Sequence, residues 1–166
     1  LEITLEPGRC VDSTSGELRS FKAHVVLDDQ KLEGCARAGV PRGGLGDAPL
    51  DELLRFAGSY PHTVHLWDDP AIHNRLEALL GPDMEAFLDN MKVQSPLTMD
   101  GSVYYVVGNM PHRGGLDNAA FLADPASDTI NVILFVDKAR KDFKEGGREV
   151  ALPADVVTMI ENMEQP

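Results

Sequence analysis

The sequence has no hydrophobic run that approaches the roughly 20 apolar residues of a membrane-spanning helix. It also shows no cleavable leader. It opens at Leu1–Leu5, a segment typical of a strand already under way, so we expect a longer precursor whose first part is absent. A lipid anchor on that absent part stays open. The 166 residues have room for one domain plus a small appendage.

Basic residues are scarce. The 15 Lys and Arg residues stand against 27 Asp and Glu residues, which gives a formal net charge of −12. Nucleic-acid binding is not expected, because a binder neutralises phosphates with Lys and Arg. Two interpretations of the charge stay open: it keeps a protein soluble, or it steers a cationic protein partner.

Motifs for catalysis are also missing. There is no Gly-x-Ser-x-Gly elbow, and Gly43–Gly46 lacks the lysine and the strand–helix context of a phosphate loop. The carboxylates Asp117, Asp124 and Asp128 stand at strand starts and turns, the ordinary placement of aspartate. We therefore predict that the protein is not an enzyme and that it uses no cofactor.

There are only two cysteines, Cys10 and Cys35, and they have no Cys-x-x-Cys spacing. Two reduced thiols in a cytosolic protein are one interpretation. However, Cys10 follows a strand and Pro7–Gly8, and Cys35 ends another strand, a placement that suits a bridge between neighbouring strands. We predict this disulfide and, with it, an oxidising compartment.

Residues 1–38 are predicted to form a small β unit. Its strands are expected at Ile3–Glu6, Phe21–Asp28 and Lys31–Cys35. Because two or three short strands are not stable alone in water, the disulfide with a missing upstream segment, or packing on the next domain, must complete this unit. Residues 39–49 are rich in glycine and proline and are predicted to be a linker.

Residues 50–166 are predicted to form an α+β domain, in which helices pack on an antiparallel sheet of about five strands. The predicted helices are Leu50–Phe56, Ala71–Leu80, Asp83–Met91 and Leu152–Met163. The predicted strands are Leu97–Met99, Val103–Val107, Leu116–Ala123, Thr129–Val136 and, more weakly, Lys141–Lys144. Asp69 is expected to cap the second helix, with Pro70 at its first position.

Three histidines, His62, His65 and His73, stand close together in the sequence beside Asp68 and Asp69. A metal site would need three or four ligands that converge. The residues around His62 and His65 disfavour a helix, and on a strand the two side chains would point to opposite faces. His73 falls on the polar side of its helix. We predict no metal site.

The most informative segment is the one between the apolar runs Val103–Val107 and Leu116–Ala123. A short loop with Pro111 and His112 at its tip, flanked by glycines, separates these two predicted strands. Pro111 fixes its own φ and biases the preceding residue toward an extended conformation. The pattern predicts a stiff loop that carries an imidazole outward from a rigid sheet, where binding residues often concentrate.

Further short pieces of sequence carry a family resemblance. They are Tyr60-Pro61-His62, Asn74-Arg75-Leu76 with Leu79-Leu80-Gly81, Val93-Gln94-Ser95-Pro96, Pro111-His112 and Asn131-Val132-Ile133. With these pieces, the segment from about Leu50 to Ile160 resembles the inhibitor of vertebrate lysozyme family of bacterial envelope proteins. The resemblance implies a periplasmic or outer-membrane-associated protein whose partner is a lysozyme-like glycoside hydrolase.

In that family a strand leads into a Cys-Lys-Pro-His-Asp-Cys loop, which enters the lysozyme cleft and places its histidine against the catalytic carboxylates. The resemblance implies that the partner-binding residues here are Asn109, Met110, Pro111, His112, Arg113 and Gly114. Pro111 and His112 match the family pattern. The two cysteines are replaced by Asn109 and Gly114, and the acidic residue is replaced by Arg113, which could itself pair with a partner carboxylate.

A second resemblance concerns the first 38 residues. The stretch Cys10–Gly16 and the Gly-Cys pair within Leu32–Ala36 resemble the C-terminal half of a small β-barrel domain of bacterial envelope lipoproteins. The resemblance implies that residues 1–38 are part of a truncated domain of that kind.

Two functional hypotheses follow. The retained Pro111–His112 pair favours an inhibitor that plugs the catalytic cleft of a muramidase. The missing loop cysteines favour an envelope binding or structural module that has the same fold but no inhibitory activity. A homodimer stays open under either hypothesis.

Overall fold

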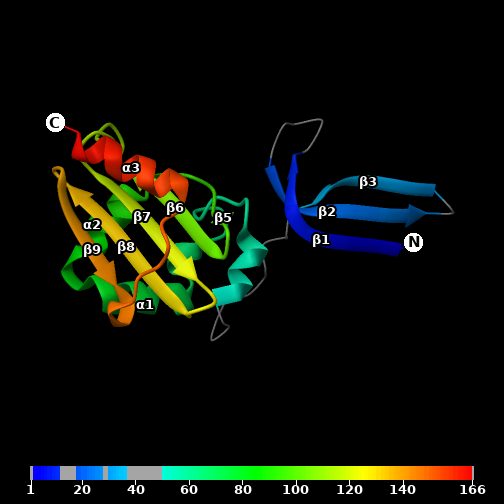
Figure 1. Ribbon diagram of the computed structural model, residues 1–166, viewed down its shortest axis with the longest axis horizontal. Coiled ribbons are helices and arrows are strands. Elements are labelled where there is room, and N and C mark those ends of the chain that lie inside the picture. Colours follow the sequence, from blue (N-terminus) through cyan, green and yellow to red (C-terminus); the bar gives the residue numbers. More distant parts are fainter. Residues whose placement is uncertain (1, 12–17, 28–29, 37–49, 166) are drawn as a thin grey trace.

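The computed structural model of the protein describes residues 2–11, 18–27, 30–36 and 50–165. It contains two antiparallel sheets, and helices pack on the second of them (Figure 1). The predicted α+β class is therefore confirmed. The predicted linker, residues 39–49, lies outside the described residues. None of the helices in the described ranges combines the length and the apolar character needed to cross a membrane.

The first sheet has three strands in the order β1-β2-β3. They are β1 (Glu2–Val11), β2 (Leu18–Leu27) and β3 (Gln30–Ala36). Strand β1 is longer than the predicted Ile3–Glu6, because it continues beyond a register shift between Pro7 and Cys10. An irregularity of this kind bends a strand and increases its twist.

The predicted disulfide between Cys10 and Cys35 is present, with the two Cα atoms 5.5 Å apart. The prediction that it joins neighbouring strands is wrong, because Cys10 lies on β1 and Cys35 on β3, and both strands pair with β2. The disulfide therefore links the two outer strands across the central one. The register shift in β1 lies directly before Cys10, between Pro7 and Cys10.

The second sheet has the order β4-β6-β7-β8-β9, and β5 also pairs with β6. Its strands are β4 (Val93–Gln94), β5 (Thr98–Asp100), β6 (Val103–Asn109), β7 (Asn118–Asp124), β8 (Thr129–Val136) and β9 (Ala139–Lys144). All five predicted strands are found. Strand β4 is additional, because two residues are too few to show a periodic pattern. Strand β7 begins at Asn118 rather than Leu116, because Leu116 and Asp117 donate backbone hydrogen bonds to Arg113 O in the preceding loop.

Three α-helices accompany this sheet, together with short 3-10 segments. The α-helices are α1 (Pro70–Leu80), α2 (Met84–Asn90) and α3 (Ala154–Glu164). The 3-10 helices are η1 (Leu50–Phe56), η2 (Leu66–Asp68), η3 (Gly81–Asp83) and η4 (Glu145–Gly147). The predicted cap of α1 is confirmed, because Asp69 Oδ1 accepts a hydrogen bond of 3.0 Å from Ala71 N. Helix α3 starts after Pro153 rather than at the predicted Leu152.

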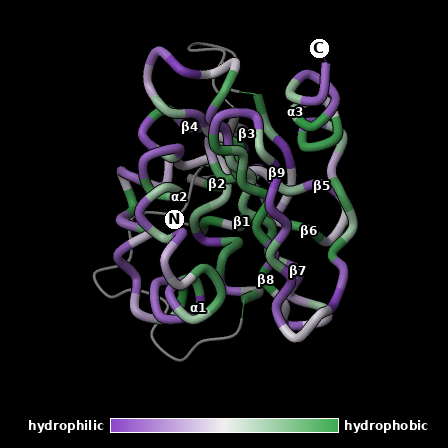
Figure 2. The backbone as a smooth tube through the Cα atoms, turned by 90° about the vertical axis from the view of Figure 1, so that its left-hand side faces the viewer, coloured by the Kyte–Doolittle hydropathy of each residue, from purple (hydrophilic) through white to green (hydrophobic). Residues whose placement is uncertain are grey.

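The central strands of the second sheet are buried on both faces. Helix α3 lies on one face and α1 and α2 on the other (Figure 1). The face toward α3 carries Val103, Tyr105, Ala120, Leu122, Ile133 and Phe135. The face toward α1 and α2 carries Tyr104, Val106, Ala119, Phe121, Ala123, Ile130, Val132 and Leu134. Strands β6 and β8 are accordingly hydrophobic along most of their length, green in Figure 2. This packing makes β6 and β7 a rigid base for the loop that connects them.

We predict that removing the disulfide loosens the first sheet and leaves the second unchanged. In a Cys10→Ser/Cys35→Ser variant the crosslink across 25 residues is lost, which costs about 3–4 kcal/mol in the chain-entropy model. Amide hydrogen exchange in β2 should become about 100- to 1,000-fold faster, while exchange in β8 serves as the internal control. Equal exchange of β2 in the variant and the parent would contradict the prediction.

Candidate functional site

The predicted binding loop connects β6 and β7 at one end of the second sheet. The two strands stay paired up to Asn109 and Asn118, and the loop closes between them, because Met110 N donates to Asp117 O at 3.2 Å. All six predicted site residues, from Asn109 to Gly114, are therefore brought together at this end of the sheet.

The tip of the loop is a tight turn that places His112 in an unusual backbone conformation. Arg113 N donates to Met110 O at 3.0 Å, so Pro111 and His112 occupy the two central positions of the turn. His112 has a φ of 62°. A type II turn has proline at its first central position and a residue with a positive φ at its second central position. The second central position favours glycine or asparagine. A histidine there is strained, and such strain is concentrated at functional sites.

Side-chain amides brace both ends of the loop. Asn109 Nδ2 donates to Met110 O at 2.9 Å, and Asn118 Nδ2 donates to Gly114 O at 2.6 Å. The side chain of Asn118 is buried, so its amide is fixed by the protein core. These hydrogen bonds supply stiffness to a loop that has no covalent crosslink of its own.

An ion-pair network holds the second half of the loop. The Arg113 guanidinium donates to Asp117 Oδ2 through Nε and to Asp137 Oδ1 through Nη2. Asp117 Oδ1 also accepts a hydrogen bond of 2.7 Å from Asp137 N, in the turn between β8 and β9. The sequence suggested that Arg113 could pair with a carboxylate of the partner. Its guanidinium instead pairs with two carboxylates of the protein itself.

The Arg113–Asp117 contact favours the charged form of both groups. Asp117 is buried, and the hydrogen bond from Arg113 holds the pKa of its carboxyl below the ordinary value of 3.8, against the effect of burial, with the Asp137 N–H acting in the same direction. The hydrogen bond with Asp117 raises the pKa of Arg113 in turn. Asp117 is therefore ionised at neutral pH and acts as the fixed anchor of the loop.

Two residues lie beneath the loop; the sequence marked Gly108 only as a flanking glycine and did not single out Asn90. Asn90, at the end of α2, is buried and donates through Nδ2 to Asn118 O at 3.0 Å and to Phe135 O at 2.9 Å. Gly108 allows close approach of the chain, because a Cβ at this position would lie 2.7 Å from Asn90 O and 2.9 Å from Val93 O. Both residues join α2 and β4 to the root of the loop.

Three of the five histidines, those considered as metal ligands, serve separate local contacts. His73 Nδ1 is 2.9 Å from Trp67 O, His65 Nδ1 is 3.5 Å from an Asp68 carboxylate oxygen, and His62 Nδ1 is 3.2 Å from Gln94 Nε2. Among the residues that the structure describes, no three His, Cys, Asp or Glu side chains converge as a metal site would require. His62 and His65 lie in a turn, so neither a helix nor a strand aligns their two rings.

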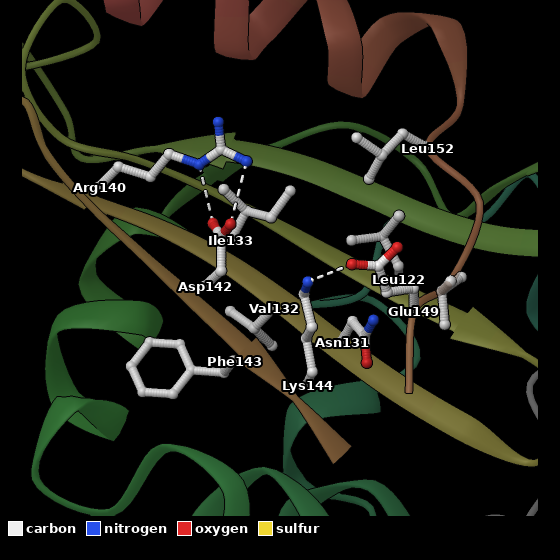
Figure 3. Close-up of a pocket in the computed structure, with 11 residues that line it drawn as sticks. Leu122, Asn131, Val132, Ile133, Arg140, Asp142, Phe143, Lys144, Glu149 and Leu152 are labelled. Atoms are coloured by element: carbon white, nitrogen blue, oxygen red, sulfur yellow. Dashed lines mark hydrogen bonds and ion pairs between the residues drawn. The ribbon is translucent and has the colours of Figure 1, made fainter. Parts of the chain in front are cut away.

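A separate cavity of about 180 Å³ lies over β8 and β9 (Figure 3). Charged side chains on its rim pair with one another: Arg140 Nε donates to Asp142 at 2.8 Å, and Lys144 Nζ donates to Glu149 at 2.6 Å. These pairs leave the charges of the rim already compensated within the protein. The loop is therefore the stronger candidate for a functional site.

Comparison with known proteins identifies the second part of the chain. A family model described as inhibitor of vertebrate lysozyme (Ivy) matches residues 71–166, more than half of the chain. The chain belongs to this family. The matched segment contains the second sheet, α2, α3 and the loop, so the family resemblance seen in the sequence is confirmed. Searches of curated proteins and of solved structures found no match.

Because the chain belongs to the Ivy family, the two loop positions that lack the family's cysteines, 109 and 114, can be compared with a disulfide bridge. A Cβ built on Gly114 would lie 3.8 Å from Asn109 Cβ and 3.3 Å from its Nδ2. Disulfide-bonded cysteines have Cβ atoms about 3.8 Å apart. Positions 109 and 114 therefore keep the spacing of the bridge that the resemblance implies, and the Asn109 amide occupies the space between them.

We predict that Asp117 makes the stability of the protein depend on acid pH. Because its folded pKa is lowered from 3.8, the carboxylate stabilises the fold fully above about pH 4, and this contribution is lost as the pH falls through the folded pKa. The melting temperature of the parent should fall more steeply between about pH 4 and pH 2 than that of Asp117→Asn. Asp68→Asn, which removes an exposed carboxylate elsewhere, is the control for the loss of one charge. Parallel pH profiles of the parent and Asp117→Asn would contradict the assignment.

Proposed function

We propose that the protein binds lysozyme-like muramidases and inhibits them by inserting the Asn109–Gly114 loop into the catalytic cleft. The observation that carries the proposal is the position of His112. It is exposed at the tip of a braced turn, with a φ of 62°, in a chain that belongs to a family of lysozyme inhibitors. An exposed histidine held at a positive φ points to a function outside the loop.

The chemistry of the target explains why an imidazole is suited to this role. A lysozyme cleft contains two carboxyl groups, one held protonated by an apolar environment and one ionised. A neutral imidazole accepts from the first through one ring nitrogen and donates to the second through the other, and an imidazolium donates to both. His112 inserted between the two groups would occupy the position that the scissile glycosidic bond requires.

The internal bracing of the loop supports this proposal. Ordering a flexible loop on binding costs about 1–2 kcal/mol for each residue fixed. Here, Pro111 and the contacts of Asn109, Arg113 and Asn118 hold much of the loop before any partner arrives. An ion pair opens more readily than a covalent crosslink, so we propose an inhibitor that is weaker than a relative with a bridged loop.

The cellular setting follows from the same family. We propose that the protein acts in the bacterial envelope, in the periplasm or at the outer membrane, as a binding protein and not as an enzyme. The disulfide between Cys10 and Cys35 supports an oxidising compartment. We further propose that residues 1–38 form a separate unit, joined by residues 39–49 to the inhibitor domain at 50–166.

The decisive test is the replacement of His112 in a lysozyme activity assay. We expect the parent to inhibit a vertebrate lysozyme, and His112→Ala to inhibit about 10- to 100-fold less, since a central interface residue of this kind is worth about 1.4–2.8 kcal/mol. His112→Asn is the sharper variant, because asparagine tolerates a positive φ and removes only the imidazole.

His24→Ala, which removes a partly exposed histidine from the first sheet, is the matched control and should inhibit like the parent. Equal inhibition by the parent and both His112 variants would rule out the plug mechanism. If the parent inhibits no muramidase, the protein is instead an envelope binding module that shares the fold without the activity, a function that the absent loop cysteines would favour.

We predict that a bridged loop strengthens inhibition. In an Asn109→Cys/Gly114→Cys variant the Cβ atoms stand at the spacing that a disulfide needs. The oxidised variant should inhibit several-fold better than its own reduced form, because less loop entropy remains to be lost on binding. The parent, compared in its oxidised and reduced forms, is the control, because reduction also opens the Cys10–Cys35 disulfide in both proteins. No gain on oxidation, with bridge formation verified by mass spectrometry, would show that loop stiffness does not limit affinity.

A further inference from the structure

The turn between β8 and β9 lies at the same end of the second sheet as the loop, because β6, β7, β8 and β9 pair antiparallel in succession. It has only two residues, Asp137 and Lys138, since Val136 pairs with Ala139. Their φ angles are 50° and 64°. Positive φ at both positions is the pattern of a type I′ turn, which favours glycine at the second position. A lysine there persists only where the surrounding structure holds it, and such strain is concentrated at functional sites.

Backbone groups of this turn hold the second half of the loop. Asp137 N donates to Asp117 Oδ1 at 2.7 Å, and Lys138 N donates to Leu116 O at 2.9 Å. The other side of the turn is tied to the chain after α3, because Lys138 Nζ donates to Gln165 O at 3.0 Å. The turn is therefore fixed between the loop and the end of α3.

The carboxylate of Asp137 reaches the residue next to His112. Its Oδ1 accepts a hydrogen bond from Arg113 Nη2, and the two groups form an ion pair. Asp117 holds the same guanidinium through Nε, so two carboxylates fix its direction. Arg113 N also donates the hydrogen bond to Met110 O that closes the turn containing His112. A displacement of Arg113 would therefore displace His112 as well.

The stability of the fold does not explain the contact between Asp137 and Arg113. The Asp137 side chain is 75% exposed, and an ion pair this open to solvent contributes little to the free energy of unfolding. Its effect is local, because it joins the loop to a turn 24 residues away in the sequence. A contact of this kind selects among conformations of the loop.

We propose that Asp137 is a positioning residue of the inhibitory loop, which acts through Arg113 to hold His112 in the conformation that enters the muramidase cleft. This inference rests on the proposed function. Asp137 does not touch the muramidase in this role. It raises the fraction of the free protein whose loop is ready to bind, and the affinity rises with that fraction.

The first test uses the free protein. Asp137→Gly removes the carboxylate but keeps the backbone N–H and the positive φ, which glycine adopts without strain. Hydrogen exchange of the Arg113 amide, followed by NMR, should become about 3- to 10-fold faster, because its hydrogen bond to Met110 O opens more often. An unchanged exchange rate would overturn the proposal, whether or not the protein binds a muramidase.

Asp128→Gly is the matched control. Asp128 lies in the turn between β7 and β8, at the opposite end of the sheet, with a φ of 45° and a 70% exposed side chain that pairs with Arg75. Arg75 keeps a second carboxylate, that of Glu145, just as Arg113 keeps Asp117. Exchange at Arg113 and inhibition should both equal those of the parent. An equal effect of the two substitutions on Arg113 would contradict the proposal.

The second test shows whether Asp137 acts on the loop or on the muramidase. Asp137→Gly should weaken inhibition of a vertebrate lysozyme about 3- to 10-fold in the parent. In the oxidised Asn109→Cys/Gly114→Cys variant the loss should be less than about 2-fold, because the bridge already holds the loop. An equal loss in both proteins would mean that Asp137 contacts the enzyme directly, and the positioning role would be wrong.

The outcomes separate this proposal from the plug mechanism. If His112→Asn weakens inhibition while Asp137→Gly equals the parent in both measurements, the plug mechanism stands and Asp137 has no positioning role. If Asp137→Gly speeds exchange at Arg113 but His112→Asn inhibits like the parent, Asp137 orders the loop and the plug mechanism is wrong. Because the Asp137 side chain is exposed, circular dichroism is expected to show an unchanged fold in Asp137→Gly.

Discussion

The burial of β6, β7 and β8 between two layers of helices is the constraint on which the rest of the structure depends. Strands covered on both faces cannot slip in register, because a shift of one residue would exchange the side chains that face α3 with those that face α1 and α2. The pairing therefore holds up to Asn109 and Asn118. It fixes where the chain leaves the sheet, and so where the loop can place His112.

The loop itself shows how polar contacts can take the place of a covalent bridge. The resemblance implies that relatives in this family have cysteines at the positions of Asn109 and Gly114. Here, those positions keep the bridge spacing, but the order of the loop comes from the Arg113–Asp117 pair and from the amides of Asn109 and Asn118. Such contacts are directional, so they define the shape of the loop without a covalent bond.

The same base also joins the loop to the surface beside it. Gly108 and Asn90 bring α2 and β4 close to the end of β6, and β4 carries Val93 and the Gln94 contact to His62. The root of the loop, α2 and β4 are therefore held by one set of packed elements rather than by independent segments.

The sequence by itself determined the local features. Continuous apolar runs determined β6 to β8, Asp69 with Pro70 determined the start of α1, and Pro111 with His112 marked the tip of the loop, because each of these signals lies within a few consecutive residues. Only the tertiary structure decided which contacts hold the loop. Asp137 is distant in sequence from Arg113, β4 is too short to show a pattern, and the disulfide joins β1 and β3, which both pair with β2. These features depend on which segments become neighbours after folding, and a local pattern carries no information about that.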